Sequence, residues 1–238
     1  MNLVLHIIAK DFLFLRGRLA AWLAVMVVKF AIGFWLVLGA DVSDKAVTNI
    51  QGGVAGLIVI DAALTLLFAA LLVQEDAVAG SAAFWRTRPI SGCRLLAAKV
   101  LGAALLLVVP ALVVALPWWV VCGLTPRQFG LAALEVVLFQ GALLAVAFTA
   151  ASVTDSLGRC FVWGLVGVAA TQGIAGGWGY WWPKWFKVSP PGEMMLLHAV
   201  LALLVMLGVI SWQYLTRRTK VALAILLVSA VAITPAAI

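Results

Sequence analysis

The chain has too few polar and charged residues to cover a water-facing surface. Asp, Glu, Lys and Arg make up 11% of its 238 residues, 66% are hydrophobic, and the mean hydropathy is +1.17. A typical soluble domain is about half apolar and about a quarter charged. The composition therefore excludes a conventional soluble domain and predicts a protein whose main solvent is the lipid bilayer.

Potential metal ligands are scarce and scattered. Structural zinc sites need clustered Cys and His ligands, but the cysteines form no Cys-x-x-Cys pair and only two histidines are present. We therefore expect no metal site and no cofactor, with the cysteines acting as small apolar packing residues. These residues are Cys93, Cys122, Cys160, His6 and His198.

Common catalytic motifs are missing as well. The sequence contains no GxxxxGK[ST], GxSxG or HExxH, so it has no phosphate-binding P-loop, no nucleophile elbow and no zinc-protease helix. The net charge of +7 does not point to nucleic acid, because the bases fall between apolar runs and form no continuous patch. We expect a protein that is not itself an enzyme and that binds no nucleic acid.

Long apolar runs predict an all-α, polytopic membrane bundle. Backbone polar groups inside a bilayer must be satisfied by helices or by a closed barrel. The alternation typical of barrel strands is absent. A spanning helix needs about 20 mostly apolar residues, and six or seven segments qualify. They are Leu19–Ala40, Val54–Val73, Val100–Cys122, Phe129–Ala151, Cys160–Gly176, Met194–Leu215 and, least securely, Val221–Ile238.

The distribution of basic residues predicts a cytoplasmic N-terminus. With that orientation, the inner segments hold most of the 16 Lys and Arg residues and the outer segments hold few, as the positive-inside rule requires. The protein is then a multi-pass component of the cytoplasmic, or inner, membrane. The inner bases are Lys10, Arg16, Arg18, Arg86, Arg88, Arg94, Lys99, Arg159, Arg217, Arg218 and Lys220, and the outer ones are Lys45, Arg127, Lys184 and Lys187.

Residues 1–18 precede the first predicted span and have a periodic apolar pattern. The pattern predicts an amphipathic elbow helix along the inner membrane surface; a simple extension of the first span is the alternative. His6, Lys10 and Asp11 lie off the apolar stripe. The stripe itself consists of Val4, Ile8, Phe12, Leu15 and Leu19.

The segment Gln74–Lys99, QEDAVAGSAAFWRTRPISGCRLLAAK, is unusually charged for this chain. The orientation places it in the cytoplasm between the second and third spans. Pro89 forces a bend, while Arg94 and Lys99 are expected to anchor the third span at the lipid headgroups. Phe84 and Trp85 add an apolar patch to a water-facing loop, and such a patch either dips into the membrane interface or docks on another protein.

This segment resembles the cytoplasmic loop of type-2 (ABC-2-like) ABC-exporter permeases. The resemblance rests on an acidic pair, a glycine, an apolar-aromatic pair, Arg-Pro and a lysine at the start of the next span. The matching residues are Glu75, Asp76, Gly80, Phe84, Trp85, Thr87, Arg88, Pro89, Ile90, Ser91, Leu95, Leu96 and Lys99.

The resemblance implies a permease domain at 19–220 that acts as a dimer, with a second copy or a paralogue, beside separate ATP-binding subunits. The loop at 74–99 would carry a coupling helix that docks on the ATPase. Its expected contacts are Glu75, Asp76, Gly80, Phe84, Trp85, Arg86, Arg88 and Pro89. Family members usually have six spans, so the possible extra segment at 221–238 departs from the pattern.

Two further function classes remain open at this point. A membrane enzyme acting on lipid would use the charged loop as its active site, and a non-transporting anchor or assembly protein would use it to hold a partner. Nothing in the sequence selects the transported substrate.

Two charged residues lie within predicted spans, where charges are costly. Lys29 is near the middle of the first span and Asp61 is within the second. Because these spans are consecutive and antiparallel, we expect a structural ion pair; a role in substrate passage or proton coupling is the alternative. Glu135, near the outer end of the fourth span, is expected to snorkel or to pair with Arg127.

Overall fold

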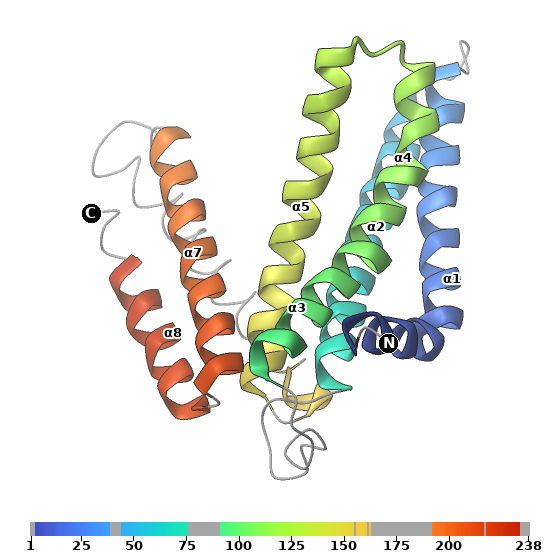
Figure 1. Cartoon of the computed structure of the whole chain (residues 1–238). Helices are drawn as coiled ribbons and strands as arrows, with labels where there is room; N and C mark the ends of the chain where they lie inside the picture. The colour runs from blue at the N-terminus through green and yellow to red at the C-terminus, as the bar shows by residue number, and fades with distance from the viewer. Residues whose placement is uncertain are drawn as a thin grey trace, which may run out of the picture. The chain divides into compact units, whose positions relative to one another are not determined.

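A computed structural model of the chain describes residues 3–38, 44–75, 91–154, 156–160, 162, 192–216 and 218–233. Within these ranges the chain forms helices and short turns and no strand (Figure 1), which confirms the all-α prediction. The helices are α1 (Leu3–Leu38), α2 (Asp44–Gln74), α3 (Gly92–Ala103), the π-helical turn η2 (Ala104–Val108), α4 (Val109–Val121), α5 (Pro126–Val153), α7 (Gly192–Thr216) and α8 (Thr219–Ile233).

Four helical stretches are long and apolar enough to cross a membrane, so the chain is a multi-pass membrane protein by length and composition. They are Leu3–Trp35, Gly56–Gln74, Gly92–Val121 and Pro126–Val153. Each contains most of one predicted span.

The remaining predicted spans have different outcomes. Cys160–Gly176 lies almost wholly outside the residues that the structure describes. The 25 residues of α7 measure about 37 Å along the axis, and they include the apolar stretch Leu203–Thr216. The 15 residues of α8 measure about 22 Å, and residues 234–238 of this predicted span lie outside the described part of the chain. The total of six or seven spans stays a prediction.

Helix α1 is continuous across the boundary predicted at residues 18 and 19. Its 36 residues measure about 54 Å, so the helix is too long to lie wholly across a core of about 30 Å. Figure 1 shows its first turns running crosswise to the rest of the helix. Whether these turns lie at a membrane surface stays a prediction.

The buried face of the first turns differs from the predicted stripe at one position. Ile8, Leu15 and Leu19 are buried within the protein, whereas Phe12 is 48% exposed. Asp11, which lies off the stripe, is 1% exposed. Positions 11 and 12 both fit the helical period, and the buried one is the acid, which has a partner described below.

The helices fall into two compact units. One unit holds α1, α2 as far as Leu72, α3 from Arg94, α4 and α5 as far as Leu144. In it α1 packs along α4, and the ring centroids of Phe34 and Trp118 lie 6.4 Å apart. Trp22 is completely buried there.

The second unit contains the end of α2, the start of α3, the end of α5 and the pair α7 and α8. The two C-terminal helices pack against each other. Gln213 near the end of α7 donates a 2.9 Å hydrogen bond to the hydroxyl of Thr219, the first residue of α8. Val209 and Ala222 have no exposed surface, so the interface between these helices is closely packed.

A π-helical turn interrupts the third span shortly before a proline. The turn at Ala104–Val108 ends two residues before Pro110. Proline has no N–H to donate to the carbonyl four residues earlier, and a π turn shifts the hydrogen-bond register locally. Pro117 lies inside α4, which continues to Val121.

Gly92, the first residue of α3, is tightly packed against α7. A Cβ atom built on Gly92 would lie 2.1 Å from the backbone oxygen of Tyr214. Real Cβ atoms do not approach this closely, and the obstacle is backbone, which cannot rotate away. Only glycine therefore fits at the start of α3.

We predict that Gly92→Ala lowers the stability of the chain in detergent micelles by about 1–3 kcal/mol, because the added methyl overpacks the contact. Thermal unfolding followed by circular dichroism measures the change. The matched control is Gly141→Ala in α5, where an added Cβ meets no atom within 4 Å. Equal unfolding temperatures for both variants would contradict the close approach.

Candidate functional site

The charged segment is fixed at its N-terminal end by Gln74, the last residue of α2. The Gln74 side-chain amide donates hydrogen bonds of 3.0 Å to the backbone oxygens of Ala151 and Thr154. It also lies 3.2 Å from the Thr154 hydroxyl. One side chain thus fastens the end of α2 to the end of α5. Because these carbonyls belong to a helix C-terminus, they have no partner within the helix.

The predicted coupling contacts lie mostly outside the described residues. Glu75 follows Gln74 and is exposed. The described chain resumes at Ser91, after the segment that carries the other predicted contacts. The residues on which the structure says nothing are Asp76, Gly80, Phe84, Trp85, Arg86, Arg88 and Pro89.

At the C-terminal end of the charged segment, Lys99 of α3 is buried rather than anchored at headgroups. Its side chain is 0% exposed, and its Nζ lies 2.9 Å from Oδ2 of Asp11, which is 1% exposed. The headgroup prediction for Lys99 was therefore wrong, whereas Arg94 on the same helix is exposed. A fully buried lysine needs an anionic partner to remain charged in a medium of low dielectric constant, and α1 supplies it.

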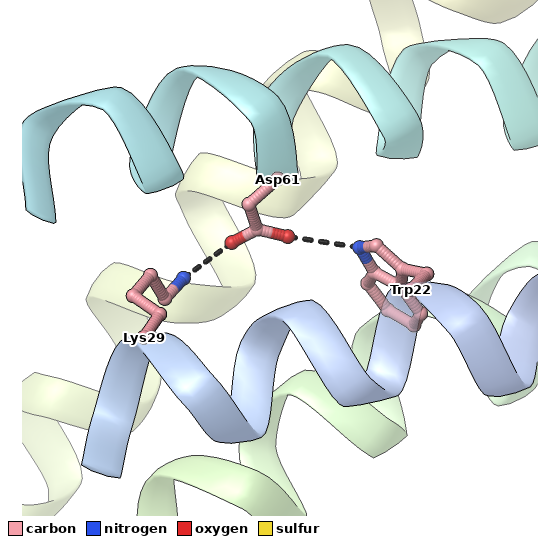
Figure 2. Close-up of polar contacts among 3 residues, drawn as sticks. All are labelled: Trp22, Lys29 and Asp61. Atoms are coloured by element: carbon pink, nitrogen blue, oxygen red, sulfur yellow. Dashed lines mark hydrogen bonds and ion pairs between the residues drawn. The ribbon is translucent and has the colours of Figure 1, made fainter. Parts of the chain in front are cut away.

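A second ionic contact joins α1 to α2, and it involves the two charges singled out in the sequence. Figure 2 shows Lys29 Nζ in contact with Asp61 Oδ2, while Trp22 Nε1 donates a 2.8 Å hydrogen bond to Asp61 Oδ1. The side chains of Lys29 and Asp61 are 15% and 4% exposed. Both carboxylate oxygens thus have a donor, which offsets part of the cost of removing the charge from water.

Sequence reasoning missed Trp22 as a member of this group. A charged residue in an apolar run stands out because it needs a partner, whereas a tryptophan is common in such a run and does not. The signal was the spacing: Asp11, Trp22 and Lys29 are 11 and 7 residues apart in the sequence, close to whole turns of a helix with about 3.6 residues per turn. All three therefore lie on one side of α1.

Next to the second ionic contact lies a cavity of about 180 Å³. Its polar lining consists of Lys29, Asp61, Glu135 and Gln140. No ion pair joins Glu135 to Arg127, although the structure describes both residues, so local pairing as the account of Glu135 was wrong. Gln140 is 3% exposed, and its side-chain oxygen has no hydrogen-bond donor among the described residues.

We predict that Lys29→Met lowers the free energy of unfolding by about 3–5 kcal/mol, because it leaves the Asp61 carboxylate buried without its countercharge. Chemical unfolding in mixed micelles, followed by tryptophan fluorescence, measures the loss. The control is the double variant Lys29→Met/Asp61→Asn, in which Trp22 retains an oxygen acceptor and no ion is stranded. It should recover at least half of the loss. If the double variant loses as much free energy of unfolding as the sum of the losses in the two single variants, the two residues do not interact.

No protein-family model, no curated protein and no solved structure matches the chain.

Proposed function

We propose that the chain is a membrane-spanning permease subunit of an ABC exporter, driven by ATP hydrolysis on a separate subunit. The likeness of Gln74–Lys99 to the coupling loops of type-2 permeases points to this function. The structural observation that supports the proposal is that the segment contacts other helices on both sides of residues 75–91. On one side Gln74 is bonded to the end of α5, and on the other Gly92 packs on α7.

The contact between Lys99 and Asp11 extends this connection to the N-terminal helix. Lys99 lies about two turns into α3, and its buried ion pair joins α3 to α1. A displacement of the charged segment would therefore pull on α1 and on the ends of α5 and α7 at once. A loop that only linked two spans would need none of these contacts.

In the proposed mechanism the chain performs no covalent chemistry. ATP binding closes the partner subunits, the segment moves with them, and the helices change between inward-open and outward-open arrangements as packed bodies. The first turns of α1 would act as the interfacial elbow, the N-terminus would be cytoplasmic, and a second permease copy or a paralogue would complete the assembly. A bundle of six or seven spans belongs to the same proposal.

The test is the identity of the partner. The chain, tagged at its N-terminus and extracted from native membranes in mild detergent, is expected to bring down a stoichiometric P-loop ATPase, identified by mass spectrometry. Phe84→Ala/Trp85→Ala should lose this partner. The chain offers a matched control, because Phe34 and Trp35 form a second Phe-Trp pair, exposed near the end of α1.

The control variant Phe34→Ala/Trp35→Ala should keep the ATPase. Two results would reject the permease assignment: a chain that is recovered alone, or one that is recovered with a partner that lacks a P-loop. The latter would favour the anchor or assembly function.

A second prediction concerns charge. Arg86→Glu/Arg88→Glu should abolish recovery of the ATPase while membrane insertion, measured by protease accessibility, stays unchanged. Arg16→Glu/Arg18→Glu carries the same charge change at the same spacing on the same predicted side of the membrane. This control should retain the ATPase. Loss in both variants would show that net charge, rather than the contact, is responsible.

A further inference from the structure

The cavity beside Lys29 lies among helices that are able to cross a membrane. Its walls are parts of α1, α2, α4 and α5, and every lining residue belongs to one of the four stretches able to cross a membrane. At about 180 Å³ it exceeds the roughly 150 Å³ of an engineered protein cavity that binds benzene. It therefore has room for a small chemical group, and it is open rather than enclosed, because Glu135 and Phe139 in its lining are exposed.

The polar atoms of the cavity leave acceptors in excess. The ammonium group of Lys29 and the carboxylate of Asp61 neutralise each other. Glu135 adds a second carboxylate, which forms no ion pair with any of the described residues. Gln140 adds a buried oxygen to which no described group donates a hydrogen bond. A buried acceptor without a donor costs about 1–3 kcal/mol, which a ligand with N–H groups would recover.

The rest of the lining is apolar. Phe30 and Phe139 contribute aromatic rings, and Met26, Ile58 and Val136 contribute aliphatic or thioether surface. Aromatic faces attract cations, and the Lys29 Nζ already lies 5.2 Å from the Phe30 ring centroid. The cavity thus combines one excess negative charge, a hydrogen-bond acceptor and an apolar wall.

We propose that this cavity binds the primary ammonium group of an amphiphilic molecule. The ammonium group is placed near Glu135 and Gln140, where its N–H groups find two acceptors, and its apolar body continues along the lining. A quaternary ammonium has the charge but no N–H to donate to Gln140. An anionic amphiphile would be repelled by the carboxylate of Glu135.

The assignment of this cavity as the binding site for the transported cargo rests on the proposed transport function. Ligand binding itself needs no ATPase and is measured on the purified full chain. Failure to find an ATPase and failure to bind an ammonium ligand are therefore separate results.

The experiment titrates the chain in dodecyl-maltoside micelles with decylammonium by isothermal calorimetry, with empty micelles subtracted. Three comparison ligands isolate each part of the proposal: decyltrimethylammonium lacks N–H donors, decyl sulfate has the opposite charge, and methylammonium lacks the apolar chain. Decylammonium should bind about tenfold or more tightly than each of them, the change expected for one charge-assisted hydrogen bond or a comparable contact.

Variants locate the site. Glu135→Gln and Gln140→Leu should each weaken decylammonium binding about tenfold or more, while Glu135→Asp should retain part of it. Gln128→Leu is the matched control on α5, because Gln128 bonds to Thr125 at the start of the helix and does not line the cavity. It should bind as the unmodified chain does. Size-exclusion profiles establish that each variant is folded.

Each of the following outcomes would contradict one part of the proposal. Undiminished binding in Glu135→Gln and Gln140→Leu overturns the site. Equal affinity for decyltrimethylammonium overturns the requirement for N–H donors, and equal affinity for methylammonium overturns the amphiphile in favour of a soluble amine. Tighter binding of decyl sulfate overturns the charge assignment.

Discussion

The cost of burying charge among apolar helices governs the arrangement of this protein. An isolated ion loses its hydration in such surroundings and is tolerated only beside a partner of opposite charge or several hydrogen-bonding groups. Helix α1 meets this requirement twice, through Asp11 with Lys99 of α3 and through Lys29 with Asp61 of α2. Apolar side chains in lipid pack in many registers at similar energy, whereas these contacts exist in one register only.

The placement of these contacts along α1 links local pattern to function. Asp11, Trp22 and Lys29 share the side of the helix that also buries Leu15 and Met26, so the polar residues replace apolar ones within a single buried stripe. The same helix is thereby tied at one end to the span that follows the charged segment and nearer its other end to a polar cavity. This arrangement provides a physical route between the proposed ATPase contact and the proposed ligand site.

Part of this could be predicted from the sequence, and the reasons differ from residue to residue. The low polarity and the length of the apolar runs led to the all-α membrane fold. Lys29 and Asp61 could be paired because charges within apolar spans are conspicuous and consecutive helices are antiparallel. Lys99 and Asp11, separated by 88 positions, each had a plausible local explanation at a membrane surface, so nothing in the sequence required them to meet.

Other features depend on packing that no single sequence displays. Trp22 is a neutral donor in an apolar run, and its role becomes visible only when Asp61 lies opposite it. Phe12 and Asp11 both fit the period of α1, and the acid is the buried one because it contacts Lys99 of α3. The cavity at Glu135 and Gln140 arises from the sizes of side chains on four helices, and no periodicity encodes it. Gly92 is constrained by one carbonyl of a distant helix.

The connection between α1 and α3 depends on Lys99 being buried against Asp11 rather than exposed at the membrane surface. The direct measurement is the rate at which a water-soluble acylating reagent modifies each lysine of the folded chain in open membrane fragments, read by mass spectrometry. Lys10, which is exposed on the same helix as Asp11, provides the reference. The account predicts that Lys10 reacts while Lys99 stays protected, and that Asp11→Asn increases the modification of Lys99. Equal modification of Lys10 and Lys99 in the unmodified chain would contradict it.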